Sequence, residues 1–154
     1  MKYLTLVTAL LFLLTTACNQ ANTQKSTADS TIIAGGTTEG QWVTYTGTLP
    51  CADCGGILTK LSINETETDG NRRFKLTETY QATKNGDQDF NSEGAYTVIK
   101  GSASDPNAEV IVLNPDKDKN LQRYFQKVSA DELRMLDGEQ KNIQSNLNYT
   151  LKKQ

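Results

Sequence analysis

Histidine is absent from the sequence, and its 154 residues include only three cysteines. A structural zinc site takes four ligands, usually cysteine and histidine, so a chain with no histidine and a single Cys-x-x-Cys pair gives little support for zinc. An excess of charge is also absent, because 16 basic and 18 acidic residues leave a formal net charge of −2. Without a basic patch, the sequence does not favour nucleic acid as a partner.

The one long apolar run lies at the N-terminus, and it is too short to cross a bilayer. It follows Lys2 and extends over residues 3–14, whereas a spanning helix needs ~20 apolar residues. A basic start, a short apolar segment and a small residue before the cut site are typical of a secretory signal. The run ends in Leu14-Thr15-Thr16-Ala17-Cys18, which resembles the lipobox of bacterial lipoproteins, where the cysteine is acylated and becomes the first mature residue. We expect residues 1–17 to be a lipoprotein signal peptide and Cys18 to carry lipid such as palmitate; an ordinary secretory signal is the alternative.

A polar segment separates this signal from the rest of the chain. Residues 19–40 are rich in Asn, Gln, Thr, Ser and Gly, a composition that behaves as a flexible spacer. We therefore expect residues 18–40 to form a lipidated N-terminus and tether, and residues 41–154 to form one domain. Acyl chains hold such a protein to a membrane. Asparagine rather than aspartate after Cys18 favours the outer membrane, by analogy with enterobacterial sorting. No acidic cluster resembling a surface-export tag follows Cys18, so we expect the periplasmic face.

The rest of the chain shows an alternation of apolar and polar residues that predicts an all-β fold. A period of two places one set of side chains on a buried face and the other in water. Turn-forming residues separate the alternating runs, as in Lys84-Asn85-Gly86-Asp87 and Asp137-Gly138. About eight short strands at this spacing indicate an up-and-down barrel or a sandwich. The expected strands cover residues 43–49, 57–64, 73–80, 94–100, 109–114, 121–129, 132–137 and 148–152.

Three polar residues fall on faces that are otherwise apolar: Thr59, Glu78 and Gln126. They can lie near the mouths of a barrel, where water reaches them, or the register of these strands can differ from the one read from the pattern. Alternatively, they can line a small polar cavity of the kind that holds a ligand in an eight-stranded barrel.

Cys51 and Cys54 lie in the connection between the first two expected strands, after Pro50 and before Gly55-Gly56. Three interpretations stay open. A disulfide would form readily in an oxidising periplasm, although so small a ring adds less stability than a long one. A redox enzyme usually places its first cysteine at a helix N-terminus, and the flanks here are strand-like. Two thiolates favour Cu(I) among metal ions, because Cu(I) prefers soft ligands and accepts few of them.

The segment from Tyr45 to Ile57, Tyr-Thr-Gly-Thr-Leu-Pro-Cys-Ala-Asp-Cys-Gly-Gly-Ile, resembles the signature of the N-terminal domain of the NlpE family. The C-terminal part is similar to the closing strands of that family, through residues 133–138 followed by Ile143, Ser145, Leu147, Asn148, Tyr149 and Leu151. The resemblance implies a lipocalin-like β-barrel on an outer-membrane lipid anchor. It also implies a role in copper tolerance and in signalling envelope stress to a two-component sensor kinase, with the family's Cys-x-x-Cys at Cys51 and Cys54. Longer members carry a second, OB-like domain with further cysteines, so functions that depend on that domain are not expected of this sequence.

These observations combine into one expectation. The protein is a monomeric, lipid-anchored, non-enzymatic sensor or binding module in copper homeostasis and envelope stress. It has no catalytic residues, and Cys51 and Cys54 form its metal- or redox-responsive site, with Cu(I) as the candidate ion. Its expected partners are the membrane, through Cys18, and an envelope-stress sensor protein. The alternatives are a lipocalin-like carrier of a small apolar or acyl ligand and a thiol–disulfide oxidoreductase.

Overall fold

The computed structural model describes residues 41–65 and 69–154. The expected signal peptide (1–17), the lipidation site Cys18 and the tether (18–40) lie outside the described residues. Within the described part of the chain, no helix is long and apolar enough to cross a membrane.

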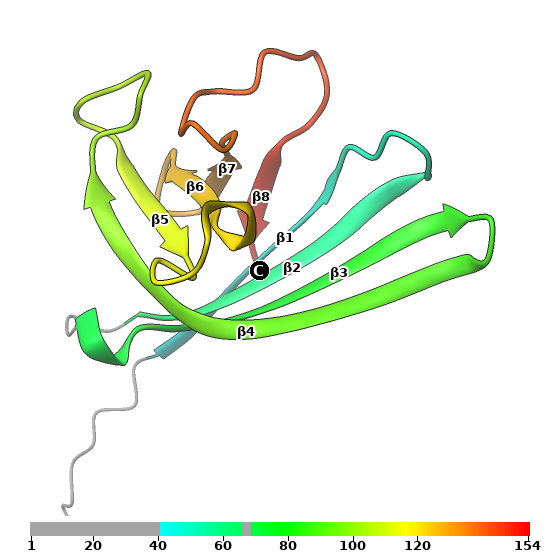
Figure 1. Cartoon of the computed structure of the whole chain (residues 1–154), viewed down its shortest axis with the longest axis horizontal. Coiled ribbons are helices and arrows are strands. Elements are labelled where there is room, and N and C mark those ends of the chain that lie inside the picture. The colour runs from blue at the N-terminus through cyan, green and yellow to red at the C-terminus, as the bar shows by residue number, and fades with distance from the viewer. Residues whose placement is uncertain (1–40, 66–68) are drawn as a thin grey trace, which may run out of the picture. The chain divides into compact units, whose positions relative to one another are not determined.

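Eight strands form a closed antiparallel barrel in which each strand pairs with its neighbours in sequence (Figure 1). Two short 3-10 turns, η1 (Asp69–Asn71) and η2 (Lys119–Leu121), interrupt the connections. The all-β, up-and-down barrel predicted from the alternation is therefore confirmed. The strands are β1 (Gln41–Leu49), β2 (Gly56–Glu65), β3 (Arg73–Thr83), β4 (Gly86–Lys100), β5 (Glu109–Leu113), β6 (Arg123–Lys127), β7 (Glu132–Met135) and β8 (Thr150–Lys153).

The main core fills the barrel with the inward-facing residues of the alternating strands. Its largest fully buried side chains are Tyr45, Phe74 and Phe125. A second, smaller core comprises Val110, Val112, Tyr124, Leu136 and Ala108. Val110 to Leu113 of β5 are all buried, so this strand is covered on both of its faces.

The barrel closes where β1 meets β8, and this seam is short. It contains two register pairs, Tyr45 with Lys153 and Thr46 with Lys152. Gly47 lies next to this seam, and a Cβ atom added there would come within 2.6 Å of the Thr150 carbonyl oxygen. The absence of a side chain at Gly47 therefore permits the close approach of the two strands.

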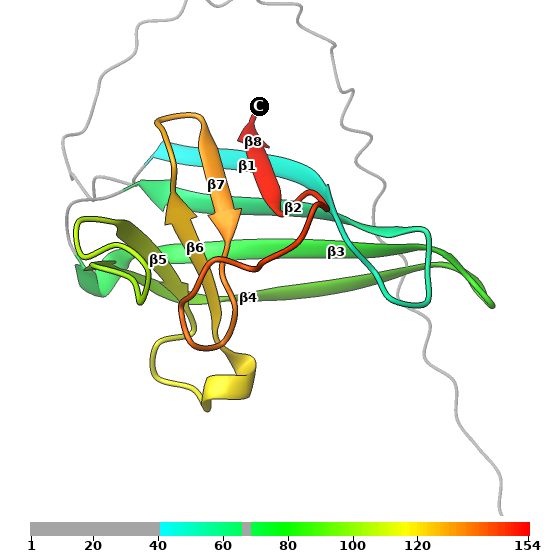
Figure 2. The ribbon, with the colours of Figure 1, turned by 90° about the horizontal axis from the view of Figure 1, so that it is seen from above.

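Strand β4 is longer than its sequence pattern predicts. It begins at Gly86 rather than at Gly94, and only Tyr96–Lys100 pair with β5. The outer half pairs with β3 alone, so the β3–β4 hairpin runs out beyond β5, β6 and β7 (Figure 2). Residues 87–93 are exposed and mostly polar. Backbone pairing with β3, rather than burial of an apolar face, makes this segment a strand, which is why the periodicity did not reveal it.

The three polar residues noted on apolar faces do not share one environment. Thr59 and Glu78 are register partners on neighbouring strands. Thr59 is buried and donates a hydrogen bond to the Ile57 carbonyl oxygen at 3.1 Å, and Glu78 lines the barrel interior. Gln126 instead lies opposite Val110, in the register of the second core outside the barrel. The interpretation that all three could line one cavity is therefore wrong for Gln126, because β5 and β6 bury their outer faces as well.

Candidate functional site: the Cys51–Cys54 loop

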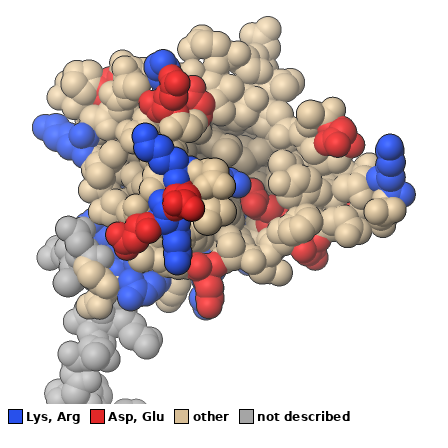
Figure 3. All heavy atoms as spheres, in the orientation of Figure 1, with Lys and Arg blue, Asp and Glu red and all other residues tan. Residues whose placement is uncertain are grey.

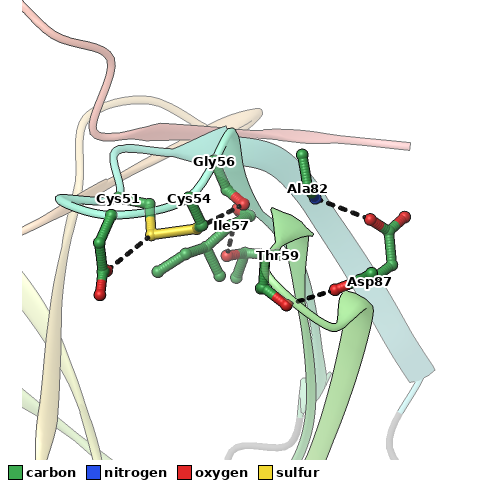
Figure 4. Close-up of a disulfide and its surroundings, with 10 residues drawn as sticks. Cys51, Cys54, Gly56, Ile57, Thr59, Ala82 and Asp87 are labelled. Atoms are coloured by element: carbon green, nitrogen blue, oxygen red, sulfur yellow. Dashed lines mark hydrogen bonds between the residues drawn. A yellow bond between two sulfur atoms is a disulfide. The ribbon is translucent and has the colours of Figure 1, made fainter.

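The two cysteines lie in the loop that joins β1 to β2, at one end of the barrel. Leu49 and Ile57 pair with each other and flank the loop. Cys51 and Cys54 are joined by a disulfide, with their Cα atoms 5.4 Å apart (Figure 4). Both are half-buried, whereas Ala52 and Asp53 between them are exposed. The two predicted site residues thus come together, but they are less exposed than a free loop tip.

The two glycines after the cysteines hold the loop against neighbouring strands. The backbone N–H of Gly55 donates to the Gln81 carbonyl oxygen of β3 at 2.7 Å. Gly56 is buried with a φ of +147°, and a Cβ atom there would come within 2.6 Å of Thr48 Cγ2. A side chain at position 56 would therefore be strained in both its backbone and its packing.

Each sulfur atom lies beside an oxygen atom. Cys51 Sγ is 3.8 Å from Asp53 Oδ1, and Cys54 Sγ is 3.4 Å from the carbonyl oxygen of Gly56. A disulfide sulfur carries no proton, so these are contacts rather than hydrogen bonds in the oxidised loop. After reduction, each thiol would have an acceptor close at hand. The charge of Asp53 works against a bare thiolate at Cys51 but favours a cation bound there.

A shallow hollow of about 280 Å³ borders the disulfide at Cys51. Cys51 and Gly55 form one part of its lining, and Leu147 and Asn148 form another. Asn148 Nδ2 donates to the Thr48 carbonyl oxygen at 3.1 Å, which ties this segment to the end of β1. Leu147 is 62% exposed. The disulfide thus lies beside an exposed aliphatic side chain that the sequence alone did not connect with it.

A larger cavity of about 390 Å³ lies inside the same mouth of the barrel. Pro50 and Ile57, on either side of the cysteine loop, line it together with Met135 and Tyr149. Met135 is far from the loop in sequence, and only the pairing of β6, β7 and β8 places it in this wall. No cluster of three or more Cys, Asp or Glu suited to a metal ion occurs among residues 41–65 and 69–154. Any metal held by this loop would therefore depend mainly on the two thiols.

The opposite mouth of the barrel is polar. A cavity of about 320 Å³ there is lined by Glu65, Arg72, Glu109 and Lys127, and by Tyr96. Tyr96 Oη donates to the Asn64 carbonyl oxygen at 2.8 Å. Burial raises the pKa of Tyr96 above its ordinary value, and the nearby Arg72 only partly opposes this shift. Burial also raises the pKa of Tyr45, and the negative charges of Glu65 and Asp131 raise it further.

Charge on the visible face of the molecule is mixed. Acidic and basic side chains alternate there without a large region of one sign (Figure 3). This distribution lacks the basic stripe that a nucleic-acid-binding surface requires.

Comparison with known proteins gives three findings. The family model described as the NlpE N-terminal domain matches residues 45–146. Lipoprotein NlpE of Escherichia coli (strain K12) is 33% identical over 107 residues, which are 70% of this chain and 39% of that protein. A crystal structure described as that of a lipoprotein from Shewanella oneidensis has a TM-score of 0.49 and 26% identity, covering 72% of this chain and 86% of that chain. The chain thus spans less than half the length of the curated relative it matches.

Proposed function

Because the chain belongs to the NlpE family, we propose that it is a lipid-anchored envelope protein that acts in copper homeostasis and in sensing envelope stress. The observation that carries the proposal is the position of Cys51 and Cys54 in a half-exposed loop at one mouth of the barrel. A pair that solvent can reach can pass between disulfide and dithiol, whereas a fully buried pair is inert. We assign the protein to the periplasmic face of the outer membrane, as a monomer whose loop is read by an envelope-stress sensor protein.

Only the reduced loop can hold Cu(I). A dithiol reductant would supply two electrons and two protons, turning the disulfide into two thiols while the reductant becomes a disulfide. Cu(I) prefers soft thiolate ligands, and each thiol gives up its proton as the metal binds. The Asp53 carboxylate, already 3.8 Å from Cys51 Sγ, would place a further negative charge beside the ion. The redox state of the pair would thus decide whether the loop takes up copper.

The surroundings of the loop favour binding over enzymatic disulfide exchange. In the enzymes, a helix N-terminus stabilises the attacking thiolate. Here Cys51 and Cys54 are flanked by β1 and β2 instead, and Asp53 brings negative charge rather than positive. We therefore propose the non-enzymatic role in preference to thiol–disulfide oxidoreductase activity.

A Cu(I) competition assay on the reduced full chain tests the proposal. We expect the wild type to bind one Cu(I), Cys51→Ser/Cys54→Ser to lose most of the affinity, and Asp53→Asn to bind more weakly but measurably. The oxidised wild type should bind none. The free energy of unfolding of the double variant should fall by no more than about 2 kcal/mol, because the disulfide closes a very short ring. A large loss of stability with unchanged copper affinity would instead make the pair a structural staple.

A second candidate function is the carriage of a small apolar or acyl ligand. The 390 Å³ cavity at the mouth has a size typical of ligand sites. Leu49, Ile57, Met135 and Ile143 give it an apolar wall, beside charged residues that include Glu78 and Arg123. Titration with a fluorescent fatty acid tests this role. A carrier should bind the probe equally well in the oxidised and reduced states, because neither cysteine is needed to fill the cavity. Failure of the wild type to bind the probe would remove this candidate.

A further inference from the structure

The outer half of β4 has a free edge. In antiparallel sheets, the backbone groups of alternate residues point to opposite edges of a strand. The N–H of Tyr96 donates towards the β3 side, to the Arg72 carbonyl oxygen, and the carbonyl oxygen of Ala95 accepts on the β5 side, from the N–H of Asn114. Odd-numbered residues of β4 therefore face β5. Since β5 pairs only with Tyr96–Lys100, the backbone groups of Asp89, Asn91 and Glu93 meet no strand in the described structure. Figure 2 shows the outer half of β4 running past the end of β5.

A cleft with a partly apolar lining runs beside this edge. It measures about 380 Å³ and separates β4 from the segment between β5 and β6. Its walls include Phe90 of β4, which is 57% exposed and stacks edge to face on Tyr80 with ring centroids 5.2 Å apart. On the other side lies Leu121, which is 53% exposed, together with the basic residues Lys117 and Arg123. Two large apolar side chains thus stay in water on either side of a space that an extended chain could fill.

On the opposite face of the same edge, the charged side chains of β4 are all acidic, and Lys75 of β3 lies in register with Glu93. Asp87, Asp89 and Glu93 are exposed and on alternate positions, and residues 86–95 contain no lysine or arginine. None of the three carboxylates forms an ion pair with a described residue. The Asp89 carboxylate accepts one hydrogen bond, which the Thr79 hydroxyl donates at 2.6 Å. A second copy paired to the same edge would oppose carboxylates to carboxylates, which destabilises cross-strand pairs.

We propose that the edge of β4 from Asp89 to Glu93 is a docking site for an extended strand of a partner protein, whose side chains alternate between aliphatic and basic. The partner's backbone would complete the hydrogen bonds of Asp89, Asn91 and Glu93, as in strand addition to an open sheet. Its aliphatic side chains would cover Phe90 and enter the cleft towards Leu121. Its basic side chains would lie beside Asp89 and Glu93. This site is separate from the cysteine loop and does not depend on copper binding.

The probe for this proposal is a blocked eight-residue peptide of alternating lysine and valine, mixed with the full chain in a non-ionic detergent. Hydrogen exchange is followed residue by residue. We expect the amides of Asp89, Asn91 and Glu93 to exchange fast in the free chain and to slow by at least about tenfold with the peptide. The amides of Phe90 and Ser92, which already face β3, should change little. A glutamate–valine peptide should not bind, and salt should weaken the lysine peptide.

Two matched controls separate backbone pairing from simple charge attraction. A lysine–valine peptide with methyl groups on alternate backbone nitrogens keeps its side chains but cannot pair, so it should bind at least about tenfold more weakly. Asn91→Pro removes one edge N–H and should weaken binding similarly, whereas Asn91→Ala keeps that N–H and should bind like the wild type. The methylated peptide leaves the fold of the protein untouched, so the test does not depend on the proline variant folding.

Several results would overturn the proposal. Equal binding of the methylated peptide would show attraction by charge alone. Slow exchange of the three amides in the free chain at low concentration would show that another part of the same chain covers the edge, and slowing that grows with protein concentration would show self-association. Binding of palmitate in the cleft, with no effect of the peptide on the three amides, would make the cleft a lipid site instead.

Discussion

Tyr96 shows how one buried phenol couples stability to pH. Because burial raises the pKa of Tyr96 above the value of 10.0 expected in the unfolded chain, the folded protein retains the phenolic proton at pH values where the unfolded chain releases it. The stabilising contribution is complete below about pH 10 and is lost as pH rises through the higher folded pKa. Tyr45, whose pKa is also raised, acts in the same direction.

We therefore expect the free energy of unfolding of the full chain to stay level up to about pH 10 and then to fall. Tyr96→Phe should cost about 1 kcal/mol at neutral pH, because the hydrogen bond to the Asn64 carbonyl oxygen is lost. It should also make the alkaline decline shallower. Urea unfolding at a series of pH values, with tyrosinate absorbance recorded, measures both effects. Tyr149→Phe, which removes a hydroxyl with no hydrogen bond to a described residue, is the control, and an equal change in both variants would contradict the explanation.

At the scale of the strands, the seam between β1 and β8 has the fewest register pairs of the eight strand pairings, with two. Gly47→Ala would place a Cβ atom 2.6 Å from the Thr150 carbonyl oxygen and 3.1 Å from Leu151 Cδ2. Since Thr150 presents backbone there, the strand itself must move. We expect a loss of about 1–3 kcal/mol and faster amide exchange at Lys152 and Lys153.

Gly138→Ala is the matched control for this seam. A Cβ atom at Gly138 meets nothing within 4 Å, so that variant should unfold like the wild type in urea and leave exchange in β8 unchanged. Equal destabilisation by the two substitutions would contradict the crowded seam as the cause, because alanine in place of glycine should stabilise the fold slightly wherever its Cβ atom meets no clash.

The alternation of apolar and polar residues predicted the strands that bury one face. It failed for strands that bury neither face or both faces. Val43 and Tyr45 of β1 point inward as expected. Residues 87–93 were missed because backbone pairing alone makes them a strand, and Gln126 was assigned to the wrong environment because β5 is covered on both faces.

The site could be predicted only in part for a similar reason. The spacing of Cys51 and Cys54 predicted that they meet, but not that Leu147 and Met135 lie near their loop. Those neighbours come from β7 and from the loop before β8, which are distant in sequence, and only the closed order of the barrel brings them to the same mouth. The free edge of β4 was not foreseen either, because it follows from the unequal lengths of β4 and β5.

At the scale of the whole molecule, the structure separates two surfaces by their chemistry. The cysteine loop continues β1 into β2, and the acidic edge lies on the outer half of β4. If both proposals hold, one barrel can report redox state or copper through the loop while it holds a partner strand at the edge. Both uses require the barrel to stay at the membrane where its partner is found. We expect the N-terminal residues to provide this anchoring.

Cys18 is the residue on which that anchoring should depend. The segment Leu14-Thr15-Thr16-Ala17-Cys18 resembles a lipobox, and acyl chains on one cysteine contribute ~0.8 kcal/mol for each methylene buried in the bilayer. We expect Cys18→Ala to abolish incorporation of labelled palmitate and to move the protein from the membrane to the soluble fraction. Cys51→Ser/Cys54→Ser, which removes the other two cysteines, should stay in the membrane and keep its label. Retention of Cys18→Ala in membranes after a high-salt wash would show that something other than lipid holds the chain there.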